Sequence, residues 1–237
     1  MDTASSSASP SSSSSPPPPS DLPSVLTELE AFKAGINAEA LHIVDDLFPA
    51  KIASLGGLYR SFGEEQRNRS VPIAAPVDPC ASGTPDVDIG INDEVCQLFQ
   101  VMKREVVELV DMLATLRLWV QLNVPRIEDG NNFGVGVQQE IMSMLDSGRS
   151  SGVAVLSVIQ GYFYRRGHMI TDSLKSPGIA DFMRGCVDAD EKQCVILRQS
   201  TLDLRNNYCM LLDKIVKNRD KLCQPKGSAS AFPSMMY

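Results

Sequence analysis

The sequence predicts an all-α protein made of four long helices in an antiparallel bundle. Apolar residues recur at helical spacing over most of the chain. In two segments they repeat every seven residues, with a second series offset by four, as in helices that pack along their length. No alternation of apolar and polar residues competes with this pattern, and short turn-like segments separate the periodic stretches. We therefore expect the helices to pack side by side.

Serine, proline and other small residues make up most of residues 1–21. Such a composition buries too little apolar surface to offset the entropy lost on ordering, so we expect a disordered tail. The four consecutive prolines at residues 16–19 have the chemistry of a ligand for proline-recognising domains, although a spacer is the simpler interpretation.

The first helix is predicted from Leu22 to about Phe62. Pro49 has no backbone N–H, so it should kink or briefly break this helix. Residues 63–90 contain four prolines and three glycines, which favour neither helix nor strand and predict a flexible linker. The apolar positions of the helix include Val25, Leu29, Phe32, Ile36, Ile43 and Leu47.

The strongest helical pattern runs from Ile91 to Val124. At about 1.5 Å per residue this helix is roughly 50 Å long. Pro125 disfavours helical geometry at the residue before it, so the helix should end there. The two heptad series are Val95, Met102, Leu109 and Leu116, and Phe99, Val106, Leu113 and Val120.

Two further helices complete the predicted bundle. One extends from Val135 to Lys175, with a weak centre at residues 147–152 (SGRSSG), where each glycine costs about 1 kcal/mol relative to alanine. Residues 176–178 (SPG) predict a turn. The last helix then continues to about Leu222, with leucines spaced by seven residues.

Charge and hydropathy narrow the classes of function. The chain has 22 basic and 29 acidic residues and a net charge of −7, which argues against binding nucleic acid through its phosphates. No stretch approaches the roughly 20 apolar residues of a membrane span, and the N-terminus lacks a signal-peptide pattern. We expect a soluble, non-secreted protein with no membrane partner, whose six cysteines are reduced.

Patterns of catalytic and metal-binding residues are weak. The two histidines, His42 and His168, lie beside no plausible nucleophile, and no glycine-rich phosphate-binding motif occurs. His42, Asp45 and Asp46 have the spacing of metal ligands on a helix, but a solvated face is the simpler interpretation. We therefore expect no enzyme activity, no metal and no cofactor.

The segment VPRIEDGNNFGVGVQQE, residues 124–140, has the spacing of an EF-hand calcium loop. Asp129, Asn131 and Glu140 fall at ligand positions one, three and twelve, with Gly134 at position six. Phe133 at position five has no oxygen, and EF-hands generally occur in pairs, so calcium binding is kept as an alternative. The other interpretation is a conformationally demanding loop between two helices that presents a charged face to a partner.

The sequence PRIEDGNNFGV within this segment resembles the activation loop of the proteasome activator family called REG or 11S. The similarity extends to FPAKIASL in the first helix, WVQLNVP before the loop and LRNNYCMLLDKIVKN in the last helix, and it covers most of residues 22–237. Membership of this family implies a four-helix subunit that assembles into a heptameric ring. It also implies a non-enzymatic activator that opens the gate of the proteasome core particle without ATP and binds its α-ring.

The same resemblance implies which residues contact the core particle. The activation loop, residues 125–134, presses on the turns that hold the gate closed. The C-terminal tail, residues 224–237, enters pockets between neighbouring α subunits, where the terminal carboxylate pairs with a lysine. The implied contact residues are Arg126, Ile127, Glu128, Asp129, Gly130, Asn131, Asn132, Phe133 and Gly134 in the loop, and Met235, Met236 and Tyr237 in the tail.

The sequence therefore supports three hypotheses. The first is a proteasome activator in the cytoplasm, with a nuclear fraction and a second type of ring subunit left open. The second is a calcium-binding helical protein that uses Asp129, Asn131 and Glu140. The third is a helical scaffold whose serine- and proline-rich tail recruits partners.

Overall fold

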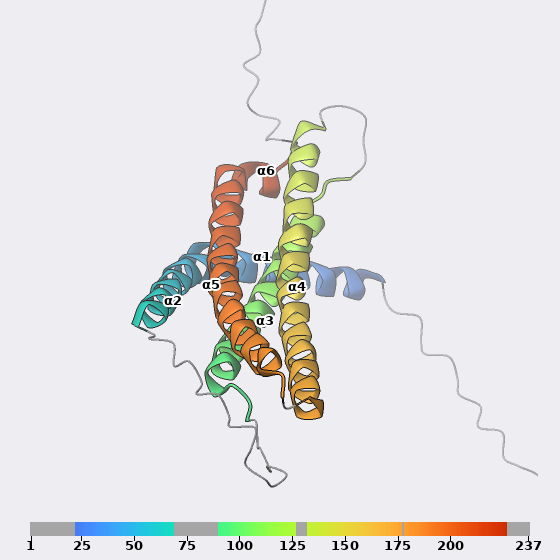
Figure 1. The fold of residues 1–237 in the computed structure, drawn as a ribbon. Coiled ribbons are helices and arrows are strands. Elements are labelled where there is room, and N and C mark those ends of the chain that lie inside the picture. Colours follow the sequence, from blue (N-terminus) through green and yellow to red (C-terminus); the bar gives the residue numbers. More distant parts are fainter. Residues whose placement is uncertain (1–21, 69–89, 127–131, 177, 227–237) are drawn as a thin grey trace, which may run out of the picture.

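The computed structural model describes residues 22–68, 90–126, 132–176 and 178–226, and the regular structure within these ranges is entirely helical (Figure 1). The all-α prediction is confirmed. The helices are α1 (Leu22–His42), the π-helical η1 (Ile43–Leu47), α2 (Phe48–Asn68), α3 (Asp93–Leu122), α4 (Phe133–Lys175), α5 (Ala180–Lys217) and α6 (Arg219–Cys223).

The helices α3, α4 and α5 run alongside one another with alternating direction, and α2 packs against α5 (Figure 1). Helix α1 crosses the others and packs against α3, so the first of the four predicted long helices changes direction partway along. The short helix α6 lies across the end of the bundle where α3 ends and α4 begins.

The predicted break at Pro49 takes the form of the π-helix η1. The N–H of Phe48 bonds to the carbonyl oxygen of Ile43, five residues earlier, as a π turn requires. Pro49 follows as the second residue of α2 and has no N–H to donate to the turn before it, so the helical hydrogen-bond pattern changes at this point.

Helix α2 continues to Asn68, so the predicted linker, residues 63–90, is wrong over its first six residues. Residues 64–67 (EEQR) are good helix formers, and the first proline of the segment comes only at Pro72. The rest of the predicted linker, residues 69–89, lies outside the described residues, as do residues 1–21. Helix α3 begins after Asn92, whose side chain accepts a hydrogen bond from the N–H of Val95 at 3.1 Å.

The core is built around α3. All eight residues of its two predicted heptad series are buried, and Trp119 and Met112 join them. Phe48 from α2 meets Tyr208 from α5 edge to face, with ring centroids 4.9 Å apart. Helix α3 therefore supplies the apolar surface on which α1, α4 and α5 pack.

Helix α4 runs unbroken through the glycine-rich centre that the sequence marks as weak. Gly148 and Gly152 are buried there, facing α3. A Cβ atom would lie 3.1 Å from Leu113 Cδ1 at the first position and 3.2 Å from Leu109 Cδ2 at the second. The two glycines thus lower helix propensity but allow α4 to approach α3 closely.

Candidate functional site

The two segments with a predicted function begin at the same end of the helices (Figure 1). Asn123 caps the C-terminus of α3, and the chain continues through Pro125 to Arg126 before it leaves the described residues. Helix α4 begins at Phe133. At the same end, α6 leads into Gln224, Pro225 and Lys226, the first residues of the predicted tail.

The structure places only part of the predicted activation loop, residues 125–134. Arg126 and Asn132 are exposed and lie outside helices. Phe133 and Gly134 are the first two residues of α4, so the predicted loop is two residues too long on that side. Ile127, Glu128, Asp129, Gly130 and Asn131 lie outside the described residues.

The first residues of the tail contact the first residues of the loop directly; we call these residues the base of the tail and the base of the loop. The Nζ atom of Lys226 donates to the carbonyl oxygen of Arg126 at 3.2 Å. Pro225 is buried, although it stands beyond the last helix. The predicted contact residues Met235, Met236 and Tyr237 lie outside the described residues.

Gln138 ties these two bases together from inside α4. Its side chain is fully buried, at 0 % exposure. The Nε2 atom donates to the carbonyl oxygen of Asn123 at 3.0 Å and to that of Leu222 at 2.9 Å. The last carbonyl groups of a helix have no partner within that helix, so one amide with two N–H groups satisfies the ends of α3 and α6 at once.

Gly134 lets the tail cross the start of α4. A Cβ atom at this position would lie 2.0 Å from the carbonyl oxygen of Pro225, far inside any tolerable contact. Only glycine therefore permits this packing. By contrast, a Cβ atom on Gly136, one half-turn further, would meet nothing within 4 Å.

Sequence reasoning missed Gln138, Asn123 and Pro225 as parts of this site. One signal was present, because the buried positions at the start of α4 follow the helical spacing Gly134, Gln138, Ile141. A glutamine at a core position of an amphipathic helix needs hydrogen-bond partners. The identity of those partners depends on how distant segments converge, which spacing alone does not show.

The residues of the calcium alternative are only partly described. Glu140 is exposed on α4 and pairs with Lys214 of α5, with Nζ and Oε1 3.3 Å apart. Asp129 and Asn131 lie outside the described residues. Within the described ranges, no three His, Cys, Asp or Glu side chains are grouped so that they can hold a metal ion.

The spacing of His42, Asp45 and Asp46 likewise does not form one site. His42 Nδ1 lies 2.7 Å from Asp46 Oδ2, and both side chains are exposed, as a solvated face predicts. Asp45 instead pairs with Arg219 at the start of α6. Near the tail, Cys223 is exposed, and partial desolvation of its thiol raises the pKa.

A helical subunit that presents a loop and a C-terminal segment in contact at one end of its bundle is the class of protein that this fold and site define. Residues 88–232 match the family described as "Proteasome activator PA28, C-terminal". The chain therefore belongs to the PA28 proteasome activator family.

Relatives across most of the chain agree with this assignment. The chain is 28 % identical to Proteasome activator complex subunit 3 of Gallus gallus over 240 residues, which cover 87 % of this chain and 94 % of the relative. The subunit 3 of Homo sapiens is 28 % identical over 238 residues, covering 86 % and 94 %.

Solved structures share the fold. The 11S subunit of the Plasmodium falciparum proteasome, PA28, is 27 % identical with a TM-score of 0.71, over 88 % of this chain and 98 % of that one. The mutated P26 activator solved in complex with an archaeal 20S proteasome is 13 % identical with a TM-score of 0.67, over 88 % and 99 %, and supports the fold alone. None of the described helices is both long and apolar enough to cross a membrane.

Proposed function

We propose that this protein is a non-enzymatic activator of the proteasome core particle that acts without ATP. The observation that carries the proposal is the contact between the bases of the loop and the tail at one end of the bundle, where Lys226 bonds to Arg126 and Gln138 bonds to both segments. A protein that must grip a partner and act on it at a fixed distance needs its two contact segments on one face. Membership of the PA28 family supports the proteasome core particle as this partner.

In the proposed mechanism, the tail supplies affinity and the loop supplies the effect. Met235, Met236 and the carboxylate of Tyr237 dock into pockets between α subunits of the core particle. One such tail binds weakly, but several tails held in one ring bind far more tightly because each docked tail raises the effective concentration of the next. The loop residues Arg126 to Gly134 then favour the open gate, which requires contacts that are stronger in the open state than in the closed one.

We infer that copies of this chain assemble into a ring, heptameric as in the family it belongs to. One face of α1 leaves a row of apolar side chains exposed, formed by Leu22, Val25, Leu26, Leu29 and Phe32. We call this row the α1 stripe. An isolated subunit would present it to water, so it is suited to contact a neighbouring subunit.

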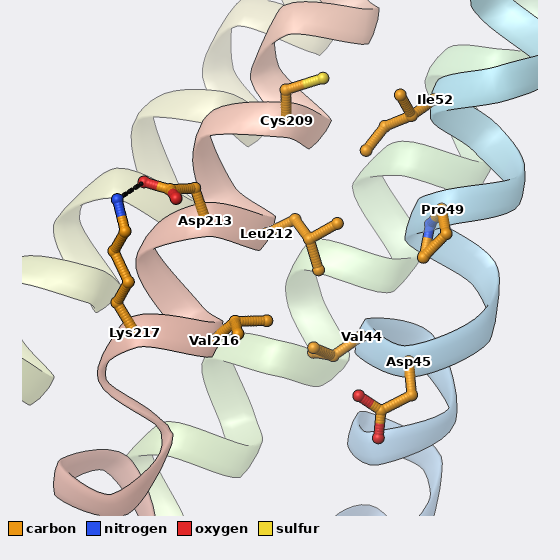
Figure 2. Close-up of a pocket in the computed structure, with 9 residues that line it drawn as sticks. All are labelled: Val44, Asp45, Pro49, Ile52, Cys209, Leu212, Asp213, Val216 and Lys217. Atoms are coloured by element: carbon orange, nitrogen blue, oxygen red, sulfur yellow. Dashed lines mark hydrogen bonds and ion pairs between the residues drawn. The ribbon is translucent and has the colours of Figure 1, made fainter.

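An open apolar groove lies between η1 and α2 on one side and α5 on the other (Figure 2). Figure 2 shows Val44, Pro49 and Ile52 facing the groove across from Leu212 and Val216, with the ion pair of Asp213 and Lys217 on the outer side of α5. Helix α1 is a continuous helix about 30 Å long that leads away from this groove, so the α1 stripe of the same copy does not reach it. Contact between the α1 stripe of one copy and the groove of the next joins two different surfaces, and this is the kind of contact that closes into rings.

The test is hydrolysis of a fluorogenic peptide by purified core proteasome, with this protein added either intact or without Tyr237. We expect the intact protein to stimulate hydrolysis and the truncated protein to lose the stimulation, because the terminal carboxylate moves by one residue. An intact protein that stimulates no core particle, including that of its own source, would contradict the proposal. Calorimetric calcium binding that Glu140→Gln abolishes would then favour the calcium alternative.

A further inference from the structure

Three separate contacts join the loop and the tail where they leave the helices. The Gln138 amide bonds to the carbonyl oxygens of Asn123 and Leu222, Gly134 packs against Pro225, and Lys226 donates to Arg126. We call these seven residues the loop–tail junction. They come from α4, from α6 and from the segments that follow α3 and α6, and all of them are described.

The Gln138 amide is the central contact because it fixes a distance. The carbonyl groups of Asn123 and Leu222 both stand at helix C-termini, which carry partial negative charge, so they do not attract each other. The amide has two N–H groups on one nitrogen, and each bonds to one of the two oxygens at 2.9–3.0 Å. The separation between the end of α3 and the end of α6 is therefore set by one side chain.

The burial of Gln138 has a cost for stability as well as a benefit. Its Oε1 atom is buried and has no hydrogen-bond partner among the described residues. A leucine at this position would remove that unpaired oxygen, but it would leave the carbonyl oxygens of Asn123 and Leu222 without their shared donor. Buried polar atoms without a partner lower stability, and such exceptions are expected at functional sites.

We propose that Gln138 is a positioning residue that couples the docked tail to the activation loop. This inference rests on the proposed function. When the tail is anchored in the core particle, the Gln138 amide transmits the position of α6 to the end of α3 and thus sets where the loop meets the gate. Without the amide, the tail still docks, but the loop samples a wider range of positions and spends less time in contact with the gate.

The first test compares Gln138→Leu with the matched control Gln139→Leu, since Gln139 is the exposed neighbour on the same helix. We expect Gln138→Leu to lower stimulated peptide hydrolysis at saturation by about tenfold, because a loop in contact only a tenth as often stimulates a tenth as much. The concentration for half-maximal stimulation should stay within about threefold, since the tails supply the affinity. The melting temperature should fall by several degrees, roughly 3–10 °C, because two carbonyl oxygens lose their donor, and Gln139→Leu should match the wild type in all three measurements.

A second variant tests the hydrogen bonds rather than the shape. Gln138→Glu keeps the size of the side chain, but its carboxylate has no proton to donate to either carbonyl oxygen. Burial beside two carbonyl oxygens raises the pKa of such a carboxyl, and the protonated form regains one donor. The stimulation relative to wild type should therefore rise as the pH falls from about 8 to about 6, whereas the ratio for Gln138→Leu should stay flat.

A third variant breaks the junction at a different contact. Gly134→Ala forces Pro225 away from α4, and we expect the same loss of stimulation with half-maximal concentration unchanged. Gly136→Ala, whose Cβ meets nothing within 4 Å, is its control and should stimulate normally.

The outcomes separate this inference from the proposed function. Full stimulation by Gln138→Leu overturns the inference, and so does a loss of binding in step with stimulation, which would make the residue merely structural. If the wild type stimulates nothing, the proposed function fails and the coupling to a gate fails with it. Hydrogen exchange of the Val124 and Gln224 amides judges the junction independently: faster exchange at both sites in Gln138→Leu supports it, and unchanged exchange overturns it.

Discussion

Tyr208 shows at the scale of one residue that this core is not optimised for stability. Its ring is fully buried against Phe48, yet its hydroxyl is buried without a hydrogen-bond partner among the described residues. Burial raises the pKa of this phenol, and the nearby carboxylates Glu105 and Glu108 raise it further. The hydroxyl therefore costs stability while the ring supplies it.

We expect Tyr208→Phe to increase the free energy of unfolding by about 1 kcal/mol, because it removes an unpaired buried hydroxyl and keeps the ring. The melting temperature should rise by roughly 2–4 °C at neutral pH. Thermal unfolding monitored by circular dichroism measures the change. The control is Tyr164→Phe, which removes an exposed hydroxyl and should have no effect.

The same variant has a pH dependence of known sign. A phenol whose pKa is higher in the folded than in the unfolded state contributes fully below the unfolded pKa, and this contribution is lost as the pH rises from that value through the folded pKa. The wild type should therefore lose stability above about pH 10, and Tyr208→Phe should lose less. An identical alkaline decline in both proteins would contradict the assignment.

At the scale of elements, Asp190 holds the far end of the bundle together. Its carboxylate on α5 accepts hydrogen bonds from Tyr162 at 2.7 Å and Arg166 at 3.1 Å, both on α4, and from Asn92 at 2.8 Å, before α3. Arg166 also donates to the Gly90 carbonyl oxygen at 3.2 Å. One carboxylate thus fixes where α3 begins relative to α4 and α5.

We expect Asp190→Ala to destabilise the fold by about 2–4 kcal/mol, because it leaves Arg166 and the Tyr162 hydroxyl largely buried without their acceptor. Asp188→Ala is the control, since the pair of Asp188 with Arg184 is exposed and should be worth under about 1 kcal/mol. Chemical denaturation of both variants measures the difference. Equal destabilisation by the two variants would mean that the Asp190 network stabilises the fold no more than an exposed ion pair does.

The elements also show what can be predicted from this sequence. Helix α3 follows from its heptad series because burial of a regular stripe is a local property of a helix. The end of α2 was placed six residues early, since the prolines that signal a break begin only after the helix has ended. The partners of Gln138 lie 15 and 84 residues away, so no local pattern could identify them.

Residues of the loop and tail illustrate a second limit. The functional roles of Arg126 to Gly134 and of Met235 to Tyr237 came from resemblance to a family, and they stay predictions. The glycines of α4 mark the opposite case, where propensity suggested a weak helix but tertiary packing explains them. Gly148 and Gly152 look unfavourable in isolation and become favourable only when α3 lies against them.

At the scale of the whole molecule, the α1 stripe and the groove predict how copies associate. Leu29→Glu combined with Phe32→Glu places two charges on the stripe, where they would have to be buried against a neighbour. We expect light scattering to show a large oligomer for the wild type and a much smaller species for the double variant. Val195→Glu, which charges an exposed apolar position on α5 outside the groove, is the control. An unchanged mass for the double variant would contradict the stripe as an assembly surface.

The burial of Pro225 limits how far Tyr237 can lie from the helical bundle. Because Pro225 is packed against α4, the chain is held to the bundle beyond the end of α6. Eleven residues follow Lys226, the last of them Tyr237, and a chain of that length spans at most roughly 40 Å. A receptor for Tyr237 must lie within that radius, and releasing Pro225 would lengthen the reach while loosening the anchor point.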